Sequence, residues 1–166
     1  KLHAQLFGSG AILNETLKAA DMLEKDYNVA VNVWSITSYK ALQNDAADVE
    51  RGNMLHSDET PRTSYITSCV ADLPGVFVAA SDYVKALPDS ISSWFPRPLI
   101  SLGTDGFGRS DSREALRDFF EVDARYITLA ALYSLAREGD IPHEEVKQAM
   151  KDLQIDSDKP NPIMAG

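Results

Sequence analysis

Side chains able to bind a metal ion or to carry out catalysis are few in this sequence and lie far apart. The three histidines are His3, His56 and His143, and Cys69 is the only cysteine. Metal sites combine several such ligands at short spacing, so the sequence predicts no metal site. Only His56 lies in a polar loop of the kind that often carries functional side chains, which makes it a secondary candidate.

One hypothesis for His56 is general base catalysis in a stand-alone hydrolase, with Asp58 or Glu59 as its acidic partner. The serine nucleophile of an α/β hydrolase occupies a strained Gly-x-Ser-x-Gly turn. Residues 7–10 read Phe-Gly-Ser-Gly and do not match that pattern. The other hypothesis is that His56 only makes a hydrogen bond within its loop. We therefore assign no catalytic residue in this chain.

The turn at Gly8 and Gly10 follows a strand-like segment and precedes a helix-like one, as a dinucleotide-binding turn does. Such a turn has Gly or Ala where this chain has Leu13, and an acid where this chain has Ile36 and Thr37. Because both requirements fail, the sequence predicts a structural turn between strand and helix and no cofactor-binding residue.

The remaining candidate is the loop of residues 103–111, which combines glycines with charged side chains around one apolar ring. Closely spaced glycines let the backbone adopt positive φ and approach another surface. The loop follows a predicted strand, at the edge where open α/β sheets hold ligands or neighbouring domains. Its candidate site residues are Gly103, Asp105, Gly106, Phe107, Gly108, Arg109 and Asp111. A functional or interface role and a purely structural turn both remain open.

The elements that position this loop follow from hydrophobic periodicity. Short apolar runs predict four strands, at residues 4–7, 29–36, 76–80 and 99–102. Helical spacing predicts helices at residues 13–23, 39–49, 64–71, 111–120, 123–137 and 142–153, and a poorer one at 82–94 that Pro88 interrupts. Residues 51–63 are expected to be a loop. Strands that alternate with helices indicate an α/β fold with parallel strands and a helical C-terminal portion.

Length and composition fit a single globular domain over residues 1–166, with 44% apolar and 25% charged residues. The formal net charge is −9. Nucleic acids and anionic membranes are bound through clusters of Lys and Arg, so neither is expected as a partner. The sequence shows neither a membrane span nor a signal peptide, which favours a cytoplasmic location. Because the chain starts at Lys1, we expect a fragment of a longer polypeptide.

Several stretches of the sequence match a known family in order. They are residues 7–10, 33–38, 51–56 with 59–62, and the loop at 103–113 with the helix junction at 120–123. Together they resemble the C-terminal domain of the homodimeric bacterial pyruvate dehydrogenases, the thiamine-dependent decarboxylating component of that complex. The resemblance runs from Gln5 to Asn161. The shorter Gly-x-Asp-x-Phe-Gly pattern is similar to the corresponding domain of transketolase and indicates only the superfamily.

The resemblance implies a three-layer α/β/α fold with C-terminal helices and a mixed, mostly parallel five-stranded sheet. That is one strand more than the periodicity predicts. Thiamine diphosphate and magnesium would lie between two preceding domains of the full-length enzyme, so no cofactor is expected in this chain. The implied partners are the remaining domains of the same chain, the second subunit of a homodimer, and the lipoyl-bearing acyltransferase component of the complex.

The resemblance also implies an oxidoreductase that decarboxylates pyruvate and passes the acetyl group to a lipoyl group. This chain is then expected to be an inactive interface domain. Its loop at residues 103–111 and the loop around His56 would pack on the catalytic domains or on the other subunit, with Asp105 and Arg109 in inter-domain ion pairs or hydrogen bonds. The alternative hypothesis is a regulatory module that binds a small molecule or nucleotide at the carboxyl edge of the sheet.

Overall fold

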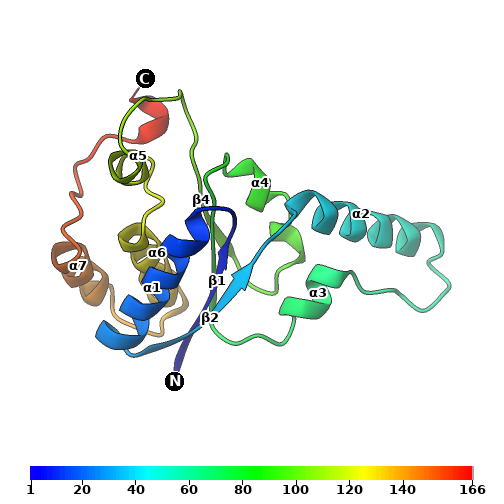
Figure 1. Ribbon diagram of the computed structural model, residues 1–166. Coiled ribbons are helices and arrows are strands. Elements are labelled where there is room, and N and C mark those ends of the chain that lie inside the picture. The colour runs from blue at the N-terminus through cyan, green and yellow to red at the C-terminus, as the bar shows by residue number, and fades with distance from the viewer. Residues whose placement is uncertain (166) are drawn as a thin grey trace.

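A four-stranded parallel sheet forms the centre of the computed structural model, which describes residues 1–165 (Figure 1). The strands are β1 (Leu2–Gly8), β2 (Val29–Ser35), β3 (Val76–Ala80) and β4 (Leu99–Leu102). Their spatial order is β2-β1-β3-β4, and the register pairs Leu2 with Val29 and Phe77 with Leu99. Crossover helices connect parallel strands, and all four predicted strands are confirmed.

Helices cover both faces of this sheet and give three layers (Figure 1). One face is covered by α1 (Ile12–Asp26), α6 (Ala124–Glu138) and α7 (His143–Asp152), with α5 (Arg113–Phe119) above them. The other face is covered by α2 (Tyr39–Leu55), α3 (Tyr65–Val70) and α4 (Ala86–Asp89). Two short 3₁₀ turns, η1 (Ser92–Trp94) and η2 (Pro162–Met164), complete the described elements.

Alternation along β1 divides the core between these two faces. Ala4 and Leu6 are fully buried on the side of α1 and α6. Phe7 lies on the opposite side, where its ring meets that of Phe95 edge-on with 5.4 Å between centroids. Gln5 is also fully buried there, and its side chain donates to the Pro74 carbonyl at 3.0 Å. Burial on both faces is typical of parallel sheets and explains why β3, buried along its whole length, is a continuous apolar run.

The expectation of a fifth, antiparallel strand is wrong for residues 1–165, because all the strand pairs in this part of the chain are parallel. After β4 the chain enters the loop of residues 103–111, called the glycine-rich loop below. The helices α5, α6 and α7 follow it. The last segment contains Pro160 and Pro162, which lack the N–H that a strand needs to donate. Within residues 1–165, the outer edge of β4 therefore has no strand paired to it.

Two predicted helix boundaries also differ from the structure. Helix α2 continues to Leu55, beyond the predicted end near residue 49, even though Gly52 suggests a break. A Cβ at Gly52 would lie 2.6 Å from the guanidinium of Arg62, so this glycine allows close packing inside a helix. The expected helix over residues 82–94 is reduced to α4 and η1, because the backbone of Tyr83 and Lys85 bonds to the glycine-rich loop instead.

Within residues 1–165, none of the helices has the length and apolar character needed to cross a membrane.

Candidate functional site at the carboxyl edge of the sheet

The glycine-rich loop starts at the carboxyl end of β4 and is fixed at its base. The Thr104 amide donates to the Tyr83 carbonyl at 2.9 Å, and the Thr104 hydroxyl donates to the Asp82 carbonyl at 2.7 Å. The carboxylate of Asp105 accepts a hydrogen bond from the Lys85 amide at 2.9 Å. A Cβ at Gly103 would lie 2.5 Å from the Tyr83 carbonyl oxygen, so only glycine fits this approach. The loop base is thus joined to the segment that follows β3.

The tip of the same loop, residues 106–111, is exposed. Gly106 has φ +100°, which other residues rarely adopt. The Phe107 side chain is 79% exposed. The Arg109 guanidinium stacks on the Phe119 ring of α5, 4.2 Å from its centroid. The tip therefore presents an aromatic ring outward, while its exposed arginine packs against an aromatic ring of the same chain.

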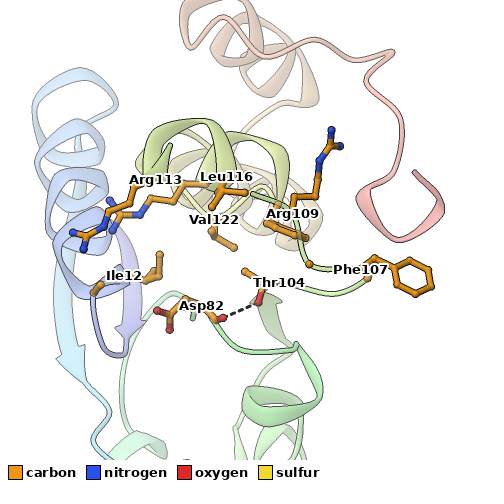
Figure 2. Close-up of a pocket in the computed structure, with 13 residues that line it drawn as sticks. Ile12, Asp82, Thr104, Phe107, Arg109, Arg113, Leu116 and Val122 are labelled. Atoms are coloured by element: carbon orange, nitrogen blue, oxygen red, sulfur yellow. Dashed lines mark hydrogen bonds between the residues drawn. The ribbon is translucent and has the colours of Figure 1, made fainter. Parts of the chain in front are cut away.

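A cavity of about 460 Å³ lies between this loop, the start of α1 and helix α5 (Figure 2). Its apolar wall is formed by Ala11, Ile12, Leu116, Phe120 and Val122. The remaining lining residues come from the loops and from α5, and they are Asp82, Thr104, Gly106, Phe107, Gly108, Arg109, Arg113 and Arg117. Cavities of this size, mostly apolar with a few charged groups, are typical small-molecule sites.

The wall formed by α5 is anchored by a buried carboxylate on α1. Glu15 accepts a hydrogen bond from the Arg117 guanidinium at 2.9 Å and from the Ala124 amide at 3.2 Å. Lys18 forms a third contact with Glu15 at 3.2 Å, from the solvent side. Because one carboxylate binds α1, α5 and the start of α6 together, the position of the cavity wall depends on it.

The C-terminal segment folds back over the other end of α5. The ammonium of Lys159 donates to the carbonyls of Asp118 and Phe119 and to the Tyr126 hydroxyl. Burial, with the nearby carboxylates of Asp118 and Glu121, raises the pKa of Tyr126 to about 12. Further along, η2 approaches the loop tip, since a Cβ on Gly106 would lie 3.2 Å from the Pro162 carbonyl oxygen. Both the loop and α5 therefore contact this segment.

Asp111 has a local role at the start of α5. Its carboxylate accepts a hydrogen bond from the Ser112 amide at 2.7 Å. The N-cap itself is Ser112, whose hydroxyl accepts from the Ala115 amide at 3.2 Å. The predicted helix start at Asp111 therefore lies one residue too early, because serine and aspartate are both good N-cap residues.

His56 lies away from the loop, in a separate polar pocket at the end of α2. Its Nδ1 is 3.6 Å from a carboxylate oxygen of Glu59, and both side chains are mostly exposed. Asn53 holds the neighbouring segment through two hydrogen bonds of 2.9 Å to the backbone of Arg62. No buried nucleophile accompanies His56 among the residues that line this pocket. The geometry gives no support to the hydrolase hypothesis.

The turn at Gly8 is a packing feature. A Cβ there would lie 2.6 Å from the Thr16 hydroxyl and 2.9 Å from the Leu13 Cα. The glycine lets β1 and α1 approach each other, which agrees with the structural interpretation of this turn. In residues 1–165, moreover, no group of three or more His, Cys, Asp or Glu side chains is arranged to hold a metal ion.

Sequence reasoning missed the charged side chains that complete the cavity, namely Asp82, Arg113 and Arg117. The sequence could have indicated Asp82 as a site residue, because it follows a predicted strand at the carboxyl edge of the sheet. No sequence pattern indicates the two arginines, because their position at the cavity depends on the packing of α5 against α1 through Glu15.

Comparison with protein families gives a match to the transketolase-like TK C-terminal domain over residues 1–123. Curated relatives include the pyruvate dehydrogenase E1 components of Cupriavidus necator, 47% identical over 96% of this chain, and Escherichia coli K12, 48% identical over 97%. The corresponding protein of Mycolicibacterium smegmatis is 41% identical over 92%. The chain spans 18% of the length of the first two relatives and 16% of the third.

A similar fold occurs in a solved structure described as a split gene transketolase, inactive beta4 tetramer. The TM-score is 0.53 with 18% sequence identity, and the match covers 81% of this chain and 39% of that one. At this identity the likeness concerns the fold alone, and it agrees with an α/β arrangement built on a parallel sheet.

Proposed function

Because this chain belongs to the transketolase-like TK C-terminal domain family, we propose that it is the C-terminal domain of a pyruvate dehydrogenase of the homodimeric bacterial type. The observation that carries the proposal is identity of 41–48% to pyruvate dehydrogenase E1 components over nearly the whole chain. The full-length enzyme would decarboxylate pyruvate and pass the acetyl group to the lipoyl group of an acyltransferase partner. This domain would contribute surface and shape to that enzyme.

Thiamine diphosphate and magnesium, which such an enzyme requires, do not fit the residues described here. The cavity beside the glycine-rich loop is lined by a single carboxylate, that of Asp82, and by three arginines. Magnesium prefers several oxygen ligands around it, and none of the acidic clusters needed for a metal ion occurs within residues 1–165. The cofactor would therefore be held elsewhere in the full-length enzyme, and no reaction step is assigned to this chain.

The proposed interface is the carboxyl edge of the sheet. Tyr83, whose carbonyl accepts the Thr104 amide, and the adjacent Val84 are 63% and 52% exposed, and Phe107 is 79% exposed. Exposed apolar side chains gathered in one area are typical of protein interaction surfaces. We propose that this edge packs on the catalytic domains or on the second subunit. Asp105 and Arg109 already have partners within the chain. We therefore expect Phe107 to make the main contact with the neighbouring domain or subunit.

Calorimetry with thiamine diphosphate and Mg²⁺ tests the proposal. The full-length polypeptide that contains this chain should bind the cofactor and release carbon dioxide from pyruvate. The 166-residue chain should do neither. Micromolar cofactor binding by the 166-residue chain would contradict a non-catalytic role, and a full-length protein inactive on pyruvate and other 2-oxo acids would contradict the assignment to this enzyme class.

A second candidate function is supported by the cavity next to the glycine-rich loop. It lies at the carboxyl ends of β3 and β4, where α/β sheets hold ligands. A regulatory small molecule or nucleotide could bind there without any change to the interface role of Phe107, whose side chain points away from the cavity in Figure 2. Thermal-shift measurements with nucleotides and acyl-coenzyme A compounds test this function, and the absence of stabilisation by any compound would contradict it.

A further inference from the structure

The cavity at the carboxyl edge has an apolar wall large enough for the body of an organic molecule. Ile12 and Val122 are almost completely buried behind it, and Leu116 and Phe120 of the α5 region close one side. The volume of about 460 Å³ lies within the range of small-ligand sites. A ligand with an apolar part would displace water from this apolar wall, and burying the wall would favour binding.

Three arginines line this cavity, and two of them are already engaged. Arg117 is paired with the buried Glu15, so the two charges offset each other. The Arg109 guanidinium stacks on the Phe119 ring, and in Figure 2 its side chain points away from the cavity. Arg113 is different, because it takes part in none of the salt bridges or side-chain hydrogen bonds found within residues 1–165. In Figure 2 it extends from α5 toward the first turn of α1, beside Ile12.

The balance of charge limits the ligand to one negative group. Arg113 supplies one unpaired positive charge, and Asp82 supplies a negative charge at the same cavity. A triphosphate or diphosphate would be repelled by Asp82 and would find only one guanidinium for its charges. Phosphate sites usually add backbone amides from a glycine turn, whereas Gly8 serves close packing of β1 on α1, because a Cβ there would lie 2.6 Å from the Thr16 hydroxyl.

We propose that this cavity binds a monoanionic, amphipathic organic acid, with its carboxylate on the Arg113 guanidinium and its apolar body against Ile12, Leu116 and Val122. A planar guanidinium can bind a carboxylate through two parallel hydrogen bonds. The proposal rests on the second candidate function and narrows it from small molecules and nucleotides to carboxylic acids.

Calorimetric titration of the full-length polypeptide with octanoate, octanol, octylamine and ATP tests the proposal. We expect octanoate to bind most tightly, octanol more weakly, and octylamine and ATP not at all. The substitution Arg113→Gln should weaken octanoate binding about tenfold, the effect of losing one charge-assisted hydrogen-bonding partner, and should leave octanol binding unchanged. The matched control is Arg51→Gln on α2, which removes an exposed arginine outside the cavity and should change neither affinity.

A second variant tests the apolar wall. Leu116→Trp should fill the cavity and abolish the binding of both octanoate and octanol, with circular dichroism used to check that the variant folds. Failure of every compound to bind the wild type would overturn this proposal together with the small-molecule function, and the interface function would stand. Equal affinity for octanoate and octanol, tighter binding of ATP, or no effect of Arg113→Gln would overturn the carboxylate proposal alone.

Discussion

At the scale of single residues, Glu15 connects the most parts of the candidate site. This residue is 6% exposed, and its carboxylate accepts hydrogen bonds from Arg117 and from the Ala124 amide. A buried carboxylate with a guanidinium partner and a backbone donor recovers much of the solvation that it loses on folding. Removing it leaves both donors without their partner, and this costs more than the pair contributes while intact.

The substitution Glu15→Ala should therefore lower the free energy of unfolding by about 2–3 kcal/mol. Urea denaturation followed by circular dichroism measures this change. Asp21→Ala on the same helix is the control, because Asp21 pairs with Lys25 at the surface, where both side chains are about 70% exposed. Such a pair contributes about 0.5 kcal/mol or less. Equal losses in the two variants would show that Glu15 does not anchor α5.

Tyr126 makes the stability of the protein depend on alkaline pH. Burial and the neighbouring acids raise the pKa of its phenol from 10.0 to about 12. Between these values the unfolded chain loses the phenolic proton while the folded chain keeps it, so the free energy of unfolding falls as pH rises from 10 to 12. Below pH 10 the contribution is fully present.

We expect Tyr126→Phe to make this alkaline decline less steep. Urea titrations at pH 9, 10 and 11 measure it. Tyr133→Phe on the same helix serves as the control, because the Tyr133 side chain is 44% exposed, and this variant should follow the wild type at each pH. An unchanged slope in Tyr126→Phe would contradict the link between Tyr126 and alkaline stability.

The candidate residues differ in how far the sequence could predict them. The spacing of glycines at 103, 106 and 108 predicts a shaped loop, because glycine signals backbone conformation directly. The partners of Asp105 and Arg109 could not be predicted, because the Lys85 amide and the Phe119 ring meet them only after packing. For the same reason the cavity itself has no local pattern in the sequence.

At the scale of elements, turns with positive φ decide where strands and helices begin and end. Gly75 precedes β3, and Gly139 ends α6, both with φ +84°. A Cβ at Gly75 would lie 1.9 Å from the His3 carbonyl oxygen of β1, whereas a Cβ at Gly139 would have no heavy atom within 4 Å. The two positions share a backbone conformation and differ in available space.

Replacing each of these glycines by alanine separates the two effects. Gly139→Ala should cost about 1 kcal/mol, the penalty of a left-handed conformation for an L-residue. Gly75→Ala should cost about 3 kcal/mol or more, because β1 and β3 must also move apart. Thermal and urea unfolding of the two variants measure the difference. Similar costs would mean that the approach of Gly75 to His3 is relaxed in solution.

The four strands could be predicted because each contains a short run of apolar residues between turn residues, and residues 76–80 are buried along their whole length. The outer edge of the sheet could not be predicted, and a resemblance to a family supplied a fifth strand that residues 1–165 do not contain. Segment 82–85 reads as the start of a helix, but its backbone is used by the glycine-rich loop. Competition of this kind between elements is not visible in periodicity.

At the scale of the whole molecule, the chain spans about a fifth of the length of its relatives, and its exposed aromatic tip lies at the carboxyl edge of the sheet. The Phe107 side chain is 79% exposed in this chain. The hydrogen bonds at the loop base limit how much of the loop must be ordered on docking, and the aromatic ring supplies a large contact area. These properties favour docking on another domain or subunit.

Hydrogen exchange provides the test at this scale. In the full-length polypeptide, amides of residues 106–109 should exchange more slowly than in the 166-residue chain, because docking covers the loop tip. Phe107→Asp in the full-length polypeptide should remove this difference, since burying the new carboxylate costs more than the contact returns. Met54→Asp, a change at an exposed apolar position near the end of α2, is the matched control and should leave the loop protected. Equal exchange of the loop amides in both proteins would contradict the proposed interface at the carboxyl edge.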